Sequence, residues 1–372
     1  MASPEMSAID LAKLRQELEA QGHPWRSSEN SMTRLNEAER RKRLGVPVPD
    51  GTDHATLVAS NRARALGPDA RAATVGAPAS FDARNVGGSN YVTPVKDQGN
   101  CGSCVAFGTI GTAETTAAFT RGQPSLQLDL SEAHLFYVHG AAVGATCDTG
   151  WWPAPALDAF RDIGVTFEDY FPYTAGNSGG AVLNPDWPNR LAKATGWQDH
   201  TSDPAAMKAW IAAHGAIDAC FYVYQDFFSY TSGVYRHVSG SLAGGHCVTL
   251  VGYDDNQSCW IAKNSWSPAW GDHGFVKIGY GECNIESWGV FGIDGISLRF
   301  WMNNVHALGL WTNDQPDNAW AYMESMGWLK LADVSDQANL TMLEQMSSAK
   351  LRGTAVNAFT DGSNRVTQAY VF

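Results

Sequence analysis

Residues 97–114, which read DQGNCGSCVAFGTIGTAE, place two cysteines three positions apart in a glycine-rich segment that runs into an alanine-rich stretch. The stretch predicts a helix that begins at Cys104. A thiol there is suited to act as a nucleophile, because the positive end of a helix stabilises the thiolate. Cys101 would then hold the loop in place. The spacing alone is also compatible with a disulfide, a redox pair or a metal pair.

The rest of the chain does not support a metal or redox site. Zinc would need a second close pair of Cys or His, and none lies at suitable spacing. His246 and Cys247 are adjacent, so on a strand they point to opposite faces and cannot easily bind one ion. A thioredoxin-like motif would follow a strand in a βαβ unit, and that pattern is missing. We therefore expect neither a metal nor a cofactor.

Length and charge narrow the class of protein. A chain of 372 residues suggests two or three domains, and 44% hydrophobic residues with 14 Trp supply sizeable cores. The formal charge of −12 argues against a nucleic-acid partner, which would need a basic face. No apolar run approaches the ~20 residues of a membrane span. The first 21 residues lack the apolar core of a secretory signal, so either export uses another route or a signal has been removed.

The chain has an odd number of cysteines, seven. An odd count is compatible with a disulfide framework that keeps one thiol free. It is equally compatible with several reduced cysteines that pack as small hydrophobic residues. Both alternatives stay open for Cys220, Cys247 and Cys259, which lie in apolar, strand-like runs.

The first 76 residues differ from the rest in composition and in the pattern of apolar residues. Two helical patterns, over residues 7–22 and 33–45, alternate with polar stretches that contain Pro and Gly. Apolar residues are too sparse here to bury much surface, so we expect this segment to dock on another part of the protein.

The body from residue 77 has a helical half and a strand half. Helical patterns cover residues 104–119, 131–142, where Ser131 is a suitable N-cap, and 155–164. Strand patterns cover residues 216–224, 247–256, 259–266, 274–281 and 288–293. This order predicts an α+β fold with two lobes and a cleft between them.

Residues 299–372 are expected to form a third, small α+β unit. The patterns predict a strand over 306–312, helices over 317–325 and 335–350, and a hairpin over 353–372 that turns at residues 361–364. The polar residues form no recognisable catalytic group. Four tryptophans are expected to form its core, with a peptide or glycan groove as the alternative: Trp301, Trp311, Trp320 and Trp328.

A nucleophilic thiol needs an imidazole and a residue to orient it. His246, which follows two glycines that leave room for a substrate backbone, is the strongest candidate, and Asn264 fits the orienting role. Trp266 and Trp270 lie close in sequence and would exclude water. Gln98 and the backbone N–H of Cys104 would donate to an oxyanion.

Three blocks resemble the active-site blocks of the papain family of cysteine peptidases: VTPVKDQGNCGSCVAF at 92–107, GGHCVTLVGYD at 244–254 and NSWSPAWGDHGF at 264–275. The resemblance covers about residues 77–297. The stretch 220–248 and GECNIES at 281–287 are most similar to the cathepsin B branch.

The resemblance implies a role for each matching residue. Cys104 would be the nucleophile, His246 the proton shuttle and Asn264 its orienter, with Gln98 as oxyanion donor. Cys101 would pair with Cys147, whose context CDTGWW resembles a family block. The residues expected to bind substrate are Gly102, Gly150, Trp151, Gly245, Trp270 and Trp288.

Some positions depart from the family pattern. Val105 stands where Trp or Tyr is usual, and Thr149 and Ser267 replace glycines. No histidine-bearing insertion follows CDTGWW, so carboxy-dipeptidase activity is not implied. Trp288 falls at the floor of the pocket for the second residue before the cleaved bond, and its bulk predicts a preference for small or medium apolar side chains.

The resemblance implies a two-lobed papain-like fold with a helical lobe and a β-barrel-like lobe. Residues 1–76 would be an inhibitory propeptide, with Trp25 and Asn30 spaced as in cathepsin B-type propeptides. Residues 77–298 would be the peptidase domain, and residues 299–372 a C-terminal domain of unknown role.

The activity implied is that of a cysteine endopeptidase made as an autoinhibited zymogen. Its partners would be protein or peptide substrates and its own propeptide. Its compartment would be the cell exterior or a lysosome- or vacuole-like organelle. The alternative is a binding or targeting protein that uses residues 299–372 while the peptidase scaffold is silent.

Overall fold

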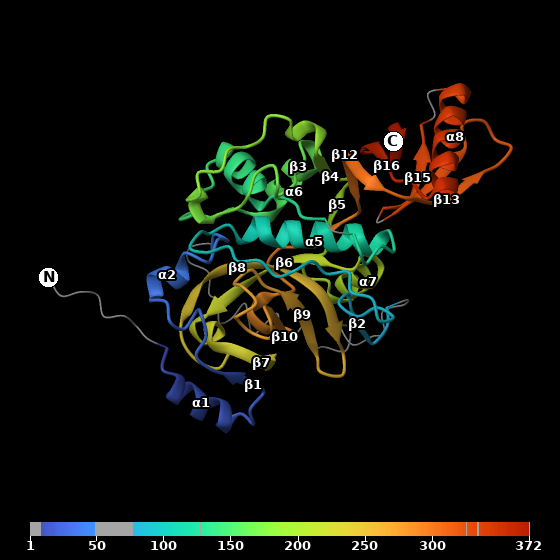
Figure 1. Cartoon of the computed structure of the whole chain (residues 1–372). Helices are drawn as coiled ribbons and strands as arrows, with labels where there is room; N and C mark the ends of the chain where they lie inside the picture. Colours follow the sequence, from blue (N-terminus) through green and yellow to red (C-terminus); the bar gives the residue numbers. More distant parts are fainter. Residues whose placement is uncertain (1–8, 49–76, 127, 325, 333–334, 372) are drawn as a thin grey trace.

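The computed structural model describes residues 9–48, 77–126, 128–324, 326–332 and 335–371. Their secondary structure is mixed, with helices and two sheets, and one long helix runs between a helix-rich and a strand-rich lobe (Figure 1). The α+β fold with two lobes that the sequence predicts is therefore confirmed.

The N-terminal segment contains α1 (Leu11–Ala20), the short strand β1 (Trp25–Ser27) and α2 (Glu37–Arg41). The Asp10 side chain caps α1 by accepting from the Lys13 N–H, and α1 buries Leu14 and Leu18. These two residues lie one turn apart on one face of the helix, as expected of a segment that docks on another part.

The helical lobe is built around α5 (Cys104–Thr120). Every residue from Cys104 to Ala118 is buried, which is possible because Ala, Gly and Thr dominate the helix and let neighbours approach it from all sides. A π-helix, η1 (His134–Gly140), and α6 (Pro153–Asp162) pack beside it. Ser131 caps η1 as predicted, since its Oγ accepts from the His134 N–H at 2.9 Å.

The strand-rich lobe holds a nine-stranded sheet in the order β1-β7-β10-β9-β8-β6-β11-β5, with β2 also paired to β8. The strands of this sheet from the body of the chain are β2 (Ser80–Asp82), β5 (Trp197–Asp199), β6 (Ile217–Tyr224), β7 (Tyr230–Tyr235), β8 (Leu242–Asp254), β9 (Cys259–Lys263), β10 (Phe275–Gly279) and β11 (Val290–Ile293). The long strand β8 pairs with both β6 and β9, so it occupies the centre of the lobe.

The connections carry one further α-helix, α7 (Pro204–His214), which packs on β8 and β6. The short 3₁₀ turns are η2 (Ala175–Asn177), η3 (Trp187–Asn189), η4 (Gln225–Ser229) and η5 (Glu282–Asn284). The five strands predicted between residues 216 and 293 are all present as β6, β8, β9, β10 and β11.

The second sheet has the order β13-β14-β15-β17-β16-β12-β4-β3. Its strands are β3 (Val165–Thr166), β4 (Leu191–Ala194), β12 (Ile296–Val305), β13 (Ala307–Thr312), β14 (Ala319–Met323), β15 (Gly327–Leu331), β16 (Val356–Asp361) and β17 (Arg365–Val371). Because β12 pairs with β4 on one side and β16 on the other, the C-terminal strands continue a sheet of the helical lobe. The boundary expected after residue 298 lies inside β12.

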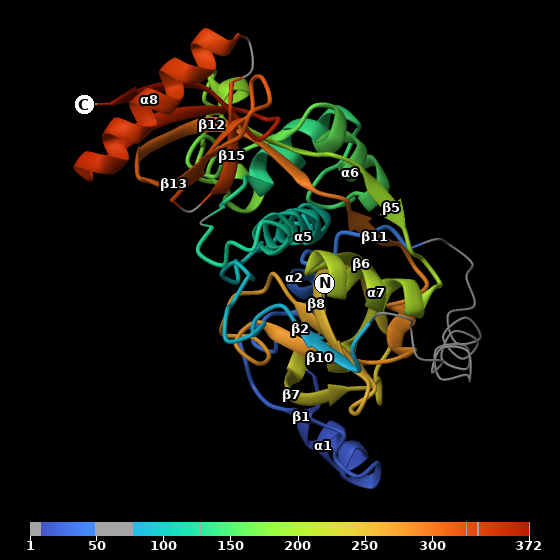
Figure 2. The ribbon, with the colours of Figure 1, turned by 90° about the vertical axis from the view of Figure 1, so that its right-hand side faces the viewer.

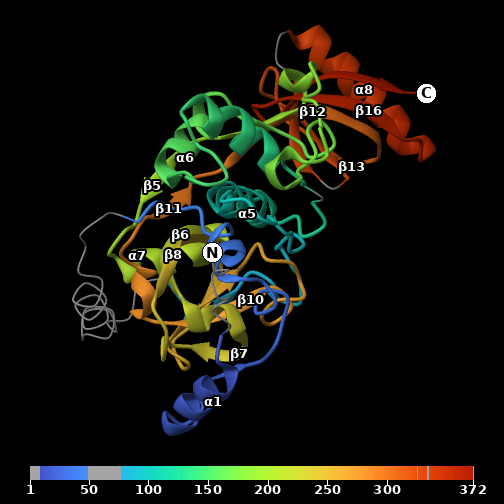
Figure 3. The ribbon, with the colours of Figure 1, turned by 90° about the vertical axis from the view of Figure 1, so that its left-hand side faces the viewer.

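The C-terminal strands are covered by α8 (Asp336–Arg352), which Ser335 caps as predicted by accepting from the Ala338 N–H. The predicted hairpin is also present, since β16 and β17 are antiparallel neighbours. This part of the chain and α1 lie at opposite ends of the molecule (Figures 2 and 3).

Two predictions for residues 299–372 are wrong. Residues 317–325 were expected to form a helix, but they contain β14, in which small and large residues alternate as AWAYM; β15 was not predicted. The expected tryptophan core is also wrong, because Trp311 and Trp328 are each 48% exposed. In β14 the alternate residues Ala319, Ala321 and Met323 are buried instead, as the two-residue period of a strand requires.

Candidate active site

Cys104 is the first residue of α5, and its side chain is fully buried. The helix therefore presents its N-terminal end to the thiol, as predicted from residues 97–114. The preceding residues form a tight loop that a disulfide fixes: Cys101 is bonded to Cys147 with an S–S distance of 1.99 Å. This is the pair that the papain resemblance implies.

His246 lies on β8 and is held by Asn264, which directly follows β9. The Nε2 atom of His246 is 2.7 Å from the Asn264 Oδ1, so this nitrogen carries the hydrogen and donates it. The Trp266 ring packs on the imidazole with the ring centroids 4.7 Å apart, and His246 and Trp266 are fully buried. The other ring nitrogen, Nδ1, has no hydrogen-bond partner among the described residues.

Burial keeps both the thiol and the imidazole neutral in this form. It raises the pKa of Cys104 to about 12, although backbone N–H groups of Cys247 and Gly45 partly offset this effect. It lowers the pKa of His246 to about 4, against a smaller opposite contribution from Asn264. A pair formed by the Cys104 thiolate and the His246 imidazolium is therefore unfavourable while the site is covered.

Gln98 has every polar atom of its side chain engaged around the same loop. Its Nε2 donates to the backbone carbonyl of Cys101 at 2.9 Å and to that of Arg43 at 3.1 Å. Its Oε1 accepts from the Ser265 hydroxyl at 2.7 Å. One of these two carbonyl groups, that of Arg43, belongs to the N-terminal segment.

Residues 43–46 of the N-terminal segment fill the space beside Cys104. Gly45 passes between Gly102 and Gly150, and a Cβ atom on Gly45 would collide with the Gly102 carbonyl. The Gly45 carbonyl accepts from the Trp151 N–H at 2.8 Å. Val46 pairs with Gly245 in an antiparallel bridge, and its N–H donates to the Gly245 carbonyl at 3.1 Å.

The rest of the segment is anchored on the strand-rich lobe. Trp25 is 1% exposed, and its Nε1 donates to the Arg236 carbonyl at 2.8 Å. The Asn30 Nδ2 donates to the Phe228 carbonyl at 3.0 Å. Arg43 forms an ion pair with Asp97 at 2.7 Å. Both positions of the Trp/Asn spacing in the sequence are thus docking contacts.

The tryptophans expected to bind substrate lie in different environments. Trp270 is fully buried behind Trp266, with its Nε1 donating to Phe228, so it backs the aromatic cluster and does not line the groove. Trp288 lies beside Gly245 and packs on Tyr222, with ring centroids 4.3 Å apart. Its position agrees with a pocket wall next to the backbone of Val46.

The residues that depart from the family pattern fit locally. Val105 is fully buried behind the thiol loop. Ser267 has a φ of +69°, a conformation that favours glycine and explains why glycine is usual there. The Thr149 hydroxyl accepts from the Thr146 N–H at 3.0 Å and stabilises the turn that carries Gly150.

Two features of the site were not predicted from the sequence. One is the close approach of Gly45, which local patterns mark only as the end of a helix. The other is a buried carboxylate beneath α5: Asp218 on β6 accepts from the Cys247 thiol at 2.8 Å and from the Thr109 hydroxyl at 3.0 Å. An acidic residue inside the apolar run AIDACFYVY was the available signal.

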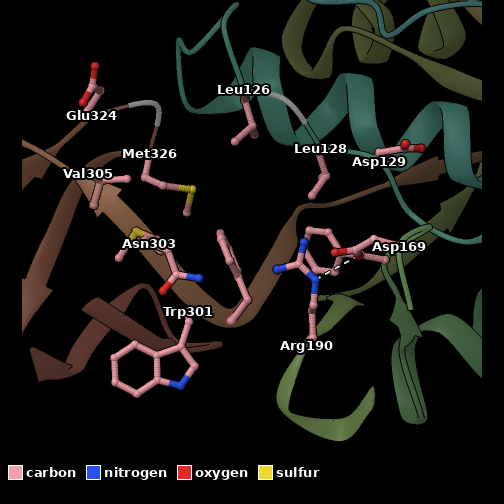
Figure 4. A pocket seen from close by; sticks show the side chains of 13 residues that line it. Leu126, Leu128, Asp129, Asp169, Arg190, Trp301, Asn303, Val305, Glu324 and Met326 are labelled. Carbon is pink, nitrogen blue, oxygen red and sulfur yellow. Dashed lines mark hydrogen bonds and ion pairs between the residues drawn. The ribbon is translucent and has the colours of Figure 1, made fainter. Parts of the chain in front are cut away.

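Figure 4 shows a cavity of about 500 Å³ between the helical lobe and the C-terminal strands. Apolar side chains such as Leu128 and Met326 line it, and Arg190 at its edge pairs with Asp169 at 3.0 Å. None of its lining residues belongs to the grouping around Cys104. The described residues contain no cluster of Cys, His, Asp or Glu that could hold a metal ion, and no described helix is long and apolar enough to cross a membrane.

Comparison with known proteins identifies a family and relatives. The sequence profile described as "Papain family cysteine protease" matches residues 77–293. "Cathepsin B-like CP3" of Giardia intestinalis is 36% identical over 238 residues, covering 60% of this chain and 77% of that protein. A "Gut-specific cysteine proteinase" of Caenorhabditis elegans is 32% identical over 238 residues, with 56% and 71% covered.

Solved structures with the same fold include zymogens. The proCathepsin B S9 of Trypanosoma congolense superposes with a TM-score of 0.58 at 24% identity, over 77% of this chain and 98% of that one. The procathepsin L2 proteinase of the Tenebrio molitor larval midgut gives a TM-score of 0.59 at 26% identity, over 76% and 88%.

Proposed function

Because the chain belongs to the papain family of cysteine proteases and resembles its cathepsin B-like members, we propose that it is an endopeptidase made as an autoinhibited zymogen. The observation that carries the proposal is the 2.7 Å hydrogen bond between His246 on β8 and Asn264 just after β9, because β8 packs on α5, the helix that begins at Cys104. Together they supply a nucleophile, a base and a residue that orients the base.

In the proposed mechanism, the Cys104 thiolate attacks the carbonyl carbon of the scissile peptide bond. His246, protonated at Nδ1 by the thiol, then gives that proton to the leaving amine. Asn264 keeps the ring aimed by accepting from Nε2. Water attacks the thioester in a second step, with His246 as the general base, and releases the acid.

The developing oxyanion needs hydrogen-bond donors at the point where charge appears. We assign this role to the Gln98 Nε2 and the Cys104 N–H. The present contact of Gln98 with the Arg43 carbonyl supports the assignment, because it indicates that this amide is directed at a main-chain oxygen in the cleft. The Cys104 N–H lies at the start of α5, where the helix dipole adds to the stabilisation, and the Gln98 amide contacts the Cys101 carbonyl in the loop before it.

The inhibitory role of residues 1–76 is proposed from the contacts of residues 43–46. This stretch occupies the groove between Gly102 and Gly150 and engages Gln98, Trp151 and Gly245. A substrate would need the same space. We also propose a peptidase domain over 77–298 and a C-terminal domain over 299–372. Strand β12 crosses the boundary between them.

Endopeptidase activity is proposed because no histidine-bearing insertion follows residues 147–152 to block one end of the groove. Protein and peptide chains would be the substrates. The bulk of Trp288 beside Gly245 favours small or medium apolar side chains at the second residue before the cleaved bond. We place the enzyme outside the cell or in a lysosome- or vacuole-like compartment.

A fluorogenic peptide assay before and after incubation at low pH tests this proposal. The wild-type chain should gain activity and lose its N-terminal segment, while Cys104→Ala should do neither. Cys259→Ala is the matched control, since Cys259 is also a free, buried cysteine but lies on β9 away from the cleft. An active Cys104→Ala variant, or a wild type that stays inactive after cleavage, would contradict the proposal; the latter would favour a binding or targeting role for residues 299–372.

We expect acid-induced cleavage near residues 75–80, and residues 75 and 76 lie outside the described part of the chain. Mass spectrometry of the processed product would locate it. A substrate series with Ala, Val, Phe or Arg at the second position before the scissile bond would test the Trp288 pocket, and a clear preference for Phe or Arg would contradict the assigned role.

A further inference from the structure

Two free cysteines of the strand-rich lobe face each other on neighbouring strands. Cys220 on β6 is directly opposite Cys247 on β8 in an antiparallel ladder. The Cys220 N–H donates to the Gly289 carbonyl, away from β8. The two residues therefore form a non-hydrogen-bonded pair, for which the Cα atoms lie ~4.5 Å apart and the side chains are closest. That separation falls within the range that disulfides span.

The surroundings of this pair place a proton acceptor beside it. Burial raises the pKa of both Cys220 and Cys247, so a thiol proton has to pass directly to a neighbouring group. The Cys247 thiol donates to the Asp218 Oδ1 at 2.8 Å, and both partners are at most 1% exposed. Gly108 of α5 makes room for them, because a Cβ there would lie 2.6 Å from the carboxylate and 2.8 Å from the Cys247 sulfur.

We propose that Cys220 and Cys247 are an oxidisable pair that forms a second disulfide with hydrogen peroxide as oxidant and Asp218 as proton acceptor. A small oxidant is required because the thiols are buried beneath α5. Burial raises the pKa of Asp218 to about 7, which suits a carboxylate that takes up a proton near neutrality.

The reaction balances in two steps. Asp218 takes the proton of Cys247, whose thiolate attacks peroxide; the O–O bond breaks, a sulfenic acid forms, and the hydroxide that leaves takes the proton from Asp218 to become water. The Cys220 sulfur then attacks the Cys247 sulfur. The S–O bond breaks, and a second water leaves with the Cys220 proton. Two thiols are oxidised and one peroxide is reduced to two waters.

The other free cysteines lack this arrangement. Cys259 on β9 is opposite Gly279 on one side and Asp254 on the other. Cys283 lies in the η5 turn. Cys104 is the remaining free thiol and sits on α5, not on the ladder. The inference is therefore specific to one pair, and it does not depend on whether the protein cleaves peptides.

The test uses the full chain carrying Cys104→Ala, which removes the proposed nucleophile. The protein is treated with hydrogen peroxide at pH 7, unfolded, alkylated and digested. We expect a mass lower by two hydrogen atoms, two fewer alkylated thiols, and a linked pair of peptides that contain Cys220 and Cys247. Dithiothreitol should reverse the change.

Three matched variants in the same background complete the test. Cys247→Ala and Cys220→Ala should each abolish the linked peptides, whereas Cys259→Ala should leave them unchanged. Asp218→Asn should slow their formation at least tenfold at pH 7. The proposed disulfide is contradicted if peroxide gives no linked peptides, if it links another cysteine, or if oxidation stops at sulfinic acid on either residue. An unchanged rate in Asp218→Asn would overturn the role of the carboxylate.

Discussion

At the scale of single residues, covering the site changes the chemistry of a few groups. Cys104 and His246 are neutral here because burial penalises the charged form of each. The imidazole keeps its orienting bond to Asn264, and only Nδ1 lacks a partner among the described residues. The hydrogen bond that would orient His246 is thus already formed, and opening the groove would return solvent to Cys104 and His246.

Replacing Asn264 with Ala should lower kcat/KM by about tenfold to a hundredfold, because a hydrogen bond to a group that becomes charged contributes ~1.5–3 kcal/mol. The pH profile should also change, since the imidazolium loses a stabilising acceptor. Steady-state kinetics of the matured enzyme across pH would measure both effects.

The exposed Asn90, whose side chain serves only a turn, provides the control. Asn90→Ala should leave kcat/KM within about twofold of the wild type, since surface changes cost ~0.5 kcal/mol or less. Equal losses in the two variants would contradict the role given to Asn264.

At the scale of elements, local patterns predicted most of the body. Strands β6 and β8 to β11 lie in runs that are mostly apolar or β-branched, and α5 starts at the residue that the glycine loop indicates. The Cys104, His246 and Asn264 positions could be found because each lies in a distinctive motif. Residues 43–46 could not, because the close approach of Gly45 to Gly102 and Gly150 arises only from tertiary docking.

Elements outside the resemblance were predicted less well. The predicted helix over 317–325 contains Ala, Met and Glu, which favour helices, but the alternation AWAYM in β14 is that of a strand with one buried face. Tertiary context decides here, because β14 has strand neighbours on both sides, β13 and β15. The exposed Trp328 and Trp311 belong to the face opposite the buried alanines.

The strand-like passage of residues 43–46 through the groove gives a prediction for Gly45→Ala. The new Cβ would collide with the Gly102 carbonyl, and overpacking of this kind costs ~1–3 kcal/mol. The unprocessed chain should therefore show roughly tenfold higher activity on a small peptide before acid treatment. Ala38→Ser, on the exposed side of α2, should show the wild-type level; unchanged latency in Gly45→Ala would exclude this contact as a determinant.

Trp25→Ala should loosen the docking of β1 on β7. The substitution removes a buried ring that packs on Tyr230 and Tyr235, and such losses cost ~3–5 kcal/mol. Limited proteolysis should cut the N-terminal segment at least tenfold faster than in wild type, while the matured enzyme keeps its activity. The half-exposed Trp328 offers the matched control: Trp328→Ala should leave the cutting rate unchanged.

At the scale of the whole molecule, the closed form depends on protonation. Burial lowers the pKa of His246 to about 4 in the covered form, below the 6.5 of an ordinary imidazole. A solvated imidazole binds a proton more readily, so closure is favoured at neutral pH and weakens as pH falls toward 4. Acid therefore favours release of the N-terminal segment.

Inhibition of the matured enzyme by a synthetic peptide of residues 9–48 would measure this effect. Its inhibition constant should rise up to ~10-fold per pH unit as pH falls from 6.5 to 4. A matched peptide with Arg43→Ala should bind more weakly at every pH, since it loses the ion pair with Asp97, yet keep the same slope. A constant that is flat or falls toward acid would contradict the role of His246.

The C-terminal strands are also expected to contribute to the stability of the whole molecule. Leu298 of β12 pairs with Ala192 of β4, and Tyr322 accepts from Gln123 near the end of α5 at 2.7 Å. A chain that stops after residue 298 would lack residues 299–305, most of β12, and would expose apolar surface. We expect it to be insoluble or to melt at least 10 °C lower than the full chain. A single contact worth ~1 kcal/mol would lower the melting temperature by only ~2–4 °C.

Scanning calorimetry would measure this loss, with a chain that lacks residues 1–76 as the control for shortening as such. That control should melt as one cooperative transition. A truncation at residue 298 that melts at the full-chain temperature would show that the C-terminal strands are independent of the rest.

The pairing of β12 with β4 has a consequence for how such a protein can evolve. A module joined by a linker can be acquired or discarded in one genetic event, because neither side relies on the other. Here β12 begins in the proposed peptidase domain, where residues 296–298 pair with β4, and continues into the tail, where residues 299–305 pair with β16. Losing the tail would leave the remaining part of β12 as an unprotected edge, so descendants of this gene would need compensating changes at β12 before they could dispense with the tail.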